Sequence, residues 1–150
     1  MKKILSGFVI FLIGGVSILT AQYNDIIDLF LEDESADTLI SAYLVLFSAG
    51  VIGEEAGPEG AADYLGTYKW GDRLLKEDSI TYGGFSLLLM KVLQIRGGLF
   101  FTLFPLPRYA AREFSSLGMI PGKRAPGSSL TPFEVLAGLN AALNVKKVGL

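Results

Sequence analysis

The sequence predicts an all-α fold, a small helical bundle built from two helix–loop–helix repeats behind an N-terminal signal segment. Apolar residues recur at i, i+3, i+4 and i+7 over several segments, which is typical of amphipathic helices. Gly50 and Gly118 follow two of these segments, where a left-handed residue often ends a helix. Thr81 and Thr131 stand where two further helices begin. One short helix pair cannot bury its own apolar face, so a second copy is expected.

The composition excludes several classes of chemistry. The 150 residues include no Cys and no His, which excludes disulfides, thiol catalysis, imidazole acid–base catalysis and the usual zinc ligands. The acidic residues do not follow the spacing of a calcium loop, so we expect no metal and no cofactor. The net charge of −2 argues against a nucleic-acid partner, which requires a basic surface.

Residues 1–21 have the three-part pattern of a signal peptide. Lys2 and Lys3 give a positive start, residues 4–19 are almost wholly apolar, and Ala21 supplies a small residue before polar Gln22. This predicts export to the periplasm or cell envelope. An uncleaved membrane anchor is the competing interpretation, because residues 4–21 just reach spanning length.

Residues 22–36 predict a short N-terminal helix over 23–31 and a polar linker. The first repeat is assigned to residues 37–98. Its first helix covers 36–49, with Asp37 near its start and Gly50 after its end, and its second helix runs from Thr81 to about residue 95. Gly83 and Gly84 in the first turn of that second helix weaken its start or let another backbone approach closely.

An insertion is expected within the first repeat at residues 54–78. The separation between Gly50 and Thr81 is 31 residues, whereas Gly118 and Thr131 are 13 apart. Two helical turns are expected in it, at 61–65 and 70–76. Its aromatic residues, including Trp70, either pin the loop to the bundle or offer a platform for a sugar or a protein partner.

Residues 99–150 are assigned to a linker and the second repeat. The apolar segment 99–107 is expected to be a buried linker between the repeats, and an exposed phenylalanine patch for protein contact is the alternative. A helix over 109–117 ends at Gly118. Thr131 and Glu134 predict a capping box at the start of the last helix, in which each side chain accepts a hydrogen bond from the other residue's amide.

Two motifs resemble the S-layer homology (SLH) family. Residues 118–122 (GMIPG) and 131–134 (TPFE) match its glycine turn and its helix start, and residues 50–53 and 81–84 match more weakly. The resemblance implies an exported, helical, non-enzymatic module that binds peptidoglycan or an anionic wall polymer. The family usually places Arg after the Thr, where this chain has Tyr82 and Pro132, and it usually has three repeats. Two repeats would complete their bundle with the N-terminal helix, the insertion or a second chain.

No sequence motif indicates an enzyme, so no catalytic residue is assigned. Arginine grips carboxylate and phosphate groups better than lysine, which makes three arginines the leading binding candidates, with a solvated face as the alternative. We expect a cell-wall glycan or an envelope protein as partner. A homo-oligomer or a larger envelope assembly stays open. The candidate ligand-binding residues are Arg96, Arg108, Arg112, Tyr109 and Trp70; the candidate structural caps are Thr81, Thr131, Glu134, Gly50 and Gly118.

Overall fold

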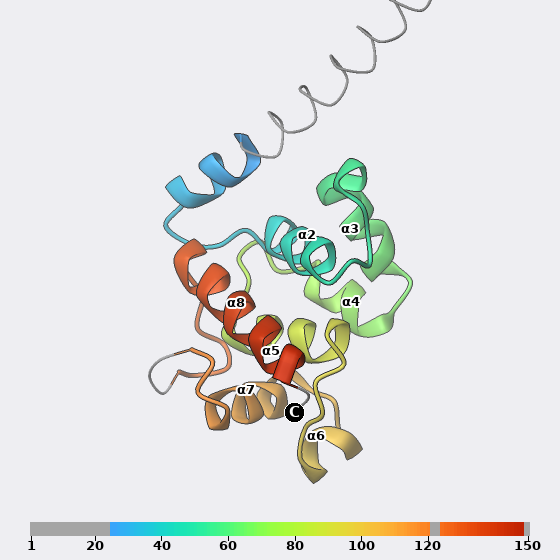
Figure 1. The fold of residues 1–150 in the computed structure, drawn as a ribbon, viewed down its shortest axis with the longest axis vertical. Helices are drawn as coiled ribbons and strands as arrows, with labels where there is room; N and C mark the ends of the chain where they lie inside the picture. Colours follow the sequence, from blue (N-terminus) through green and yellow to red (C-terminus); the bar gives the residue numbers. More distant parts are fainter. Residues whose placement is uncertain (1–24, 121–123, 149–150) are drawn as a thin grey trace, which may run out of the picture.

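The computed structural model describes residues 25–120 and 124–148. Within these residues the fold consists of helices and loops, with two isolated β-bridges and no strand, which confirms the predicted all-α class (Figure 1). None of the described helices is long and apolar enough to cross a membrane. The expected signal segment, residues 1–21, lies outside the described residues.

The helices follow the predicted order closely. A helical segment covers residues 25–32, close to the expected 23–31. The elements after it are α2 (Thr38–Ser48), the 3-10 helix η1 (Glu54–Ala56), α3 (Gly57–Gly66), α4 (Lys69–Leu74), α5 (Tyr82–Val92), α6 (Leu99–Leu103), α7 (Pro107–Ser116) and α8 (Pro132–Val148).

Side-chain caps fix the starts of α2, α5 and α8. The Ile40 amide donates to the Asp37 carboxylate at 2.8 Å, and the Gly84 amide donates to the Thr81 hydroxyl at 3.1 Å. At α8 the Glu134 amide donates to the Thr131 hydroxyl at 3.4 Å, and the Thr131 amide donates to the Glu134 carboxylate at 2.9 Å. The predicted capping box is therefore confirmed, as is the Thr81 cap.

The three capped starts meet in one ring of backbone hydrogen bonds. The Ala36 amide donates to the Leu130 carbonyl at 2.7 Å, Leu130 donates to Ile80 at 3.1 Å, and Ile80 donates back to Ala36 at 2.9 Å. All three side chains are buried. Each residue lies directly before a cap residue, so α2, α5 and α8 all start from this ring.

This ring groups the chain differently from the predicted two-repeat division. Residues 58–65 (PEGAADYL) and 107–114 (PRYAAREF) share the pattern P-x-x-A-A, with a large apolar residue three positions after the second alanine. They lie in α3 and α7. Helix α3 packs on α2, and α7 packs on α5. Residues 54–78 thus contain the counterpart of α7 rather than an insertion. Gly50 and Gly118 do not occupy equivalent positions. Gly50 follows α2, which starts at the ring, whereas Gly118 follows α7, which does not.

The two glycine stops have the predicted left-handed conformation, with φ of +71° at Gly50 and +64° at Gly118. The Val51 amide donates to Leu46 at 2.9 Å, and the Met119 amide donates to Phe114 at 3.4 Å, so both helix ends close in the expected way. Met119 is buried against the bundle, whereas Val51 is exposed.

The buried linker expected at 99–107 is wrong. The segment contains α6, and only one of its large apolar side chains, Phe101, is buried. The alternative, an exposed apolar patch, describes the segment correctly. Phe101 packs beside Gly97 and Met90, so this one side chain attaches the segment to the bundle. The exposed residues are Leu99, Phe100, Leu103, Phe104 and Leu106.

Candidate binding surface at α6 and α7

The first turns of α7 carry three of the five candidate binding residues. The Arg108 guanidinium donates to the Tyr109 hydroxyl at 2.8 Å, and its central carbon lies 4.6 Å from the centroid of the Tyr109 ring. This is a cation–π contact. Arg112 lies one turn farther along the same helix and is exposed. Pro107 fits the first helical position, where no amide hydrogen is required.

Tyr109 also connects α7 to α6. Its ring stacks on Phe100 with centroids 6.0 Å apart and an interplanar angle of 15°, and it contacts Phe104 at 6.4 Å. Tyr109 is half-buried as a result. Since its ring already packs against two phenylalanines and Arg108, Tyr109 serves to join arginine and aromatic residues rather than to offer a free sugar platform.

The outer face of α6 is apolar and open to solvent. Leu99 and Leu103 are 71% and 60% exposed, and Phe100 and Phe104 are each 55% exposed. The spacing of these four residues places them on one side of the helix, while Phe101 points into the bundle. The side chains therefore form a continuous apolar face, which we call the α6 tip.

The charge around the α6 tip is mainly positive, with one carboxylate, that of Glu113, beside Gly98 at the start of α6. Residues 79–112 contain Lys91, Arg96, Arg108 and Arg112 and no Asp or Glu, although the whole chain is acidic. All three arginines are exposed, and within the described residues none lies within 4.0 Å of a carboxylate. Arg96 precedes α6 and Arg108 follows it, so cationic groups flank the apolar face along the chain.

Trp70 lines a small cavity together with Arg73 and the segment before α7. It stacks on Tyr68 with centroids 5.8 Å apart, and this cavity has a volume of about 80 Å³. That volume is far below the roughly 300 Å³ of a small ligand pocket. Trp70 also packs against the core, which favours its predicted role as an anchor for the segment.

A neighbouring pair of tyrosines extends this aromatic group. The rings of Tyr64 and Tyr68 lie 5.5 Å apart. The pKa of Tyr64 is raised above its ordinary value, chiefly by a hydrogen bond with the Tyr68 side chain. Protonated Tyr64 is the form that this contact favours, so Tyr64 supplies no anion at neutral pH.

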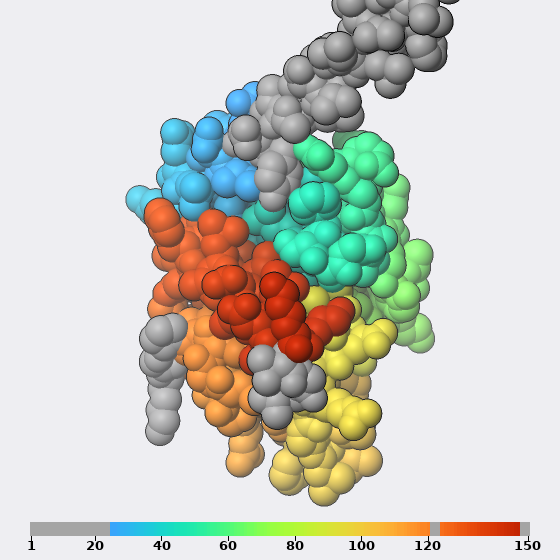
Figure 2. Space-filling view, in the orientation of Figure 1, coloured from blue at the N-terminus to red at the C-terminus, as the bar shows by residue number. Residues whose placement is uncertain are grey.

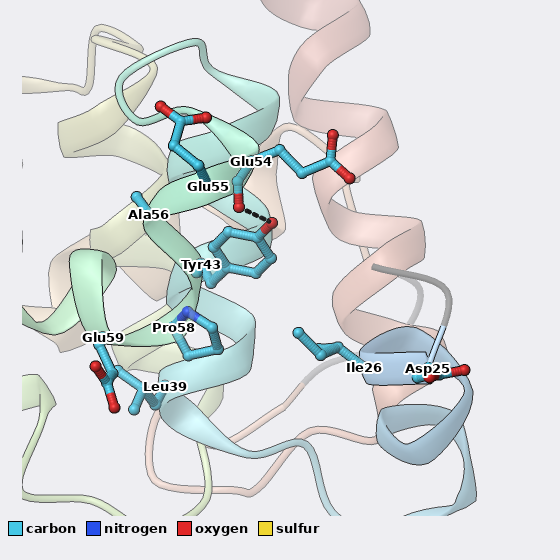
Figure 3. A pocket seen from close by; sticks show the side chains of 10 residues that line it. Asp25, Ile26, Leu39, Tyr43, Glu54, Glu55, Ala56, Pro58 and Glu59 are labelled. Atoms are coloured by element: carbon cyan, nitrogen blue, oxygen red, sulfur yellow. Dashed lines mark hydrogen bonds between the residues drawn. The ribbon is translucent and has the colours of Figure 1, made fainter. Parts of the chain in front are cut away.

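A larger cavity lies elsewhere and was not predicted. It has a volume of about 840 Å³ and lies between the segment starting at Asp25, α2 and the η1–α3 region (Figure 3). The Tyr43 hydroxyl donates to the Glu54 carbonyl at 3.3 Å beside it. Residues far apart in sequence form its walls, and no local motif marks such a place. The lining residues are Asp25, Ile26, Leu39, Tyr43, Glu54, Glu55, Ala56, Gly57, Pro58 and Glu59.

The carboxylates around this cavity do not converge. Glu54, Glu55 and Glu59 point in different directions, and none points toward another (Figure 3). Across residues 25–120 and 124–148, no three acidic side chains are grouped in a way that could hold a metal ion. The cavity therefore does not supply the facing carboxylate pair that general acid–base chemistry would use.

The fold defines a small helical protein whose surface at α6 and α7 is mainly cationic and aromatic. Family models, curated proteins and solved structures give no significant match to the chain.

Proposed function

We propose that this protein is an exported, non-enzymatic module of the cell envelope that binds peptidoglycan or an anionic wall polymer. The observation that carries the proposal is the group of exposed, unpaired arginines at α6 and α7. Arginine presents a planar fork of donors that matches carboxylate and phosphate oxygens in two-point contacts. Arg108 and Arg112, one turn apart on α7, would grip the polymer, with Arg96 as a further contact.

The architecture supports the resemblance to the SLH family. The resemblance implies three repeats around an approximate threefold axis, and three capped helices start from one hydrogen-bonded ring in this chain. The role of the family's Arg after the Thr does not transfer, however. Thr38, Tyr82 and Pro132 follow the three cap residues, and all three are buried. A polymer would therefore bind through the α7 arginines.

Co-sedimentation with purified cell wall tests the proposal. The full chain should pellet with the wall, and the triple variant Arg96→Ala, Arg108→Ala, Arg112→Ala should lose at least about tenfold in affinity, because each charge-assisted contact contributes roughly 1 kcal/mol or more. A second triple variant, Lys69→Ala, Lys76→Ala, Lys146→Ala, removes the same charge from exposed positions elsewhere. Equal retention of both variants, or no pelleting of the parent chain, would refute the assignment.

A second candidate function is a scaffold or interaction subunit of an envelope complex. The exposed α6 tip favours it, because a large apolar surface commonly marks a site of association. Mass measurement in solution and crosslinking in cells test this function. A monomer that crosslinks to no envelope protein would exclude it.

A further inference from the structure

The α6 tip extends away from the body of the protein. Figure 1 shows α6 at the end of the molecule opposite the helical segment 25–32. The space-filling view shows the same region as the yellow-to-gold lower end of the surface (Figure 2). Leu99, Phe100, Leu103 and Phe104 each keep more than half of their surface exposed, although the Tyr109 ring packs against both phenylalanines. The tip is thus a convex apolar surface that is accessible to a partner.

The tip is firmly held despite its exposure. Phe101 is buried, and a side chain at Gly97 would approach its ring to 2.6 Å, so the glycine is what permits this close packing. The Thr102 hydroxyl donates to the Gly98 carbonyl at 3.1 Å. Phe100 stacks on Tyr109 of α7. These contacts fix the direction in which the outer leucines and phenylalanines point.

The chemistry at the base of the tip identifies the partner. Arg96 and Arg108 flank α6 along the chain, and Arg112 follows on α7. One carboxylate, that of Glu113, lies beside Gly98 at the base of the tip, so the three arginines outnumber it and leave the base positive. A protein interface usually has a flatter apolar centre and a rim of mixed charge. A convex tip of Leu and Phe above arginines and a tyrosine matches the other arrangement, in which apolar groups enter a bilayer and the cations meet lipid phosphates.

We propose that the α6 tip inserts into the surface of a membrane rich in anionic phospholipid, with Arg96, Arg108 and Arg112 bound to the headgroups. Interfacial helices bury their apolar face to a depth of roughly 5–10 Å, and the exposed leucines and phenylalanines of α6 supply such a face. This inference uses the same arginines as the proposed binding of a wall polymer, but wall binding does not use the apolar tip residues. The two proposals can therefore fail separately.

A fluorescent probe on the tip tests the inference directly. The chain has no cysteine, so Leu103→Cys in the full chain gives a single labelling site for an environment-sensitive dye. Vesicles of phosphatidylglycerol and phosphatidylcholine should shift its emission to the blue, and vesicles of phosphatidylcholine alone should give at least about tenfold weaker binding. Lipids carrying a quencher in the acyl chains should quench the dye.

A matched probe and two sets of substitutions complete the experiment. The same dye at Thr67→Cys, an exposed site after α3, should stay in water, which separates insertion of α6 from recruitment by the N-terminal segment. Adding Leu99→Ser and Phe104→Ser should weaken vesicle binding about tenfold for each side chain, because each loses its apolar burial, and should leave wall binding intact. Arg108→Ala with Arg112→Ala should weaken vesicle binding about fivefold for each charge.

Three results would overturn the inference. The probe at position 103 stays in water on anionic vesicles, or it responds equally to neutral vesicles, or the tip substitutions have no effect. If a photo-crosslinker at position 103 captures an envelope protein in cells while vesicles leave the dye unshifted, the tip binds protein instead.

Discussion

Replacing Gly83 with Ala should destabilise the protein, although alanine is the better helix former. Gly83 lies in the first turn of α5, and its amide donates to the Pro126 carbonyl at 2.7 Å. A Cβ atom at this position would lie 2.9 Å from the Pro126 carbonyl oxygen and 3.1 Å from the Pro107 carbonyl oxygen. Both atoms belong to backbone, from the loop before α8 and from the start of α7, so neither can move aside as a side chain would.

The magnitude follows from two opposing effects. Helix propensity alone would make the change to Ala stabilising by about 0.5–1 kcal/mol. Overpacking against fixed backbone costs about 1–3 kcal/mol. The hydrogen bond from Gly83 to Pro126 also lengthens as the two segments move apart. The clash should prevail, which gives a net loss of about 1–2 kcal/mol in the free energy of unfolding.

Urea unfolding followed by circular dichroism and by the fluorescence of Trp70 measures this loss. With a slope of about 2 kcal/mol per molar urea, the midpoint should fall by roughly 0.5–1 M. Gly66→Ala is the control, because a Cβ atom at the last residue of α3 meets nothing within 4 Å. That variant should be as stable as the parent or more so. If Gly83→Ala matches the control, the close approach of α5, α7 and the loop at Pro126 is refuted.

Three further substitutions test the elements around the ring by the same urea assay. Thr131→Ala should cost about 1 kcal/mol by removing the helix cap, and Thr131→Ser should restore most of it; equal stability of the two would contradict the capping box. Tyr82→Phe should cost about 1 kcal/mol, because its buried hydroxyl shares a hydrogen bond of 2.8 Å with Ser115; an unchanged midpoint would argue against that contact. Gly118→Ala should cost about 1 kcal/mol because φ is +64°; a stabilised variant would show a different backbone there.

The sequence was sufficient to predict most of the helices, α6 excepted, and the caps at several of their ends, because these depend on local chemistry. A threonine three residues before a glutamate satisfies amides within one turn, as at Thr131 and Glu134. A glycine after an apolar helix supplies the left-handed residue that closes it, as at Gly50 and Gly118. Such patterns involve neighbouring residues only, and the predicted elements therefore lie near their observed bounds.

The arrangement of the helices was harder to predict, since it depends on backbone contacts between distant residues. The ring through Ala36, Ile80 and Leu130 uses amides and carbonyls that every residue possesses, so it leaves no mark in the sequence. The sequence contains the matching proline–alanine patterns of α3 and α7, but the longer spacing between Gly50 and Thr81 predicted an insertion instead. The equivalence of α3 and α7 follows from the ring, because each of them packs on a helix that starts there.

In the candidate site, too, residue types could be predicted from the sequence, whereas contacts between helices could not. Arg96, Arg108 and Arg112 could be selected from charge and residue type alone. The packing of the Tyr109 ring between Arg108 and Phe100 could not be predicted in this way. The Phe100 contact requires α6 to lie against α7. The exposure of α6 was mispredicted for a related reason. An apolar segment between two helices satisfies the pattern of a buried linker, and hydropathy does not show that one side chain, Phe101, already fills the available space.

The fold does not require the exposure of the α6 tip, and the proposed contact with a membrane would account for it. The core closes without the tip: the aromatic rings of Tyr82, Phe85 and Phe114 pack edge to face between α5 and α7, and all three are fully buried. Polar residues at positions 99 and 103 would keep Phe101 in place and remove an exposed apolar face that favours aggregation. A chain that keeps leucine at both positions, with arginines on either side and no carboxylate between residues 79 and 112, combines the two attractions that hold a protein to an anionic surface. The three-start ring supplies the rigid frame, and the tip and its arginines supply the surface through which that frame is proposed to bind.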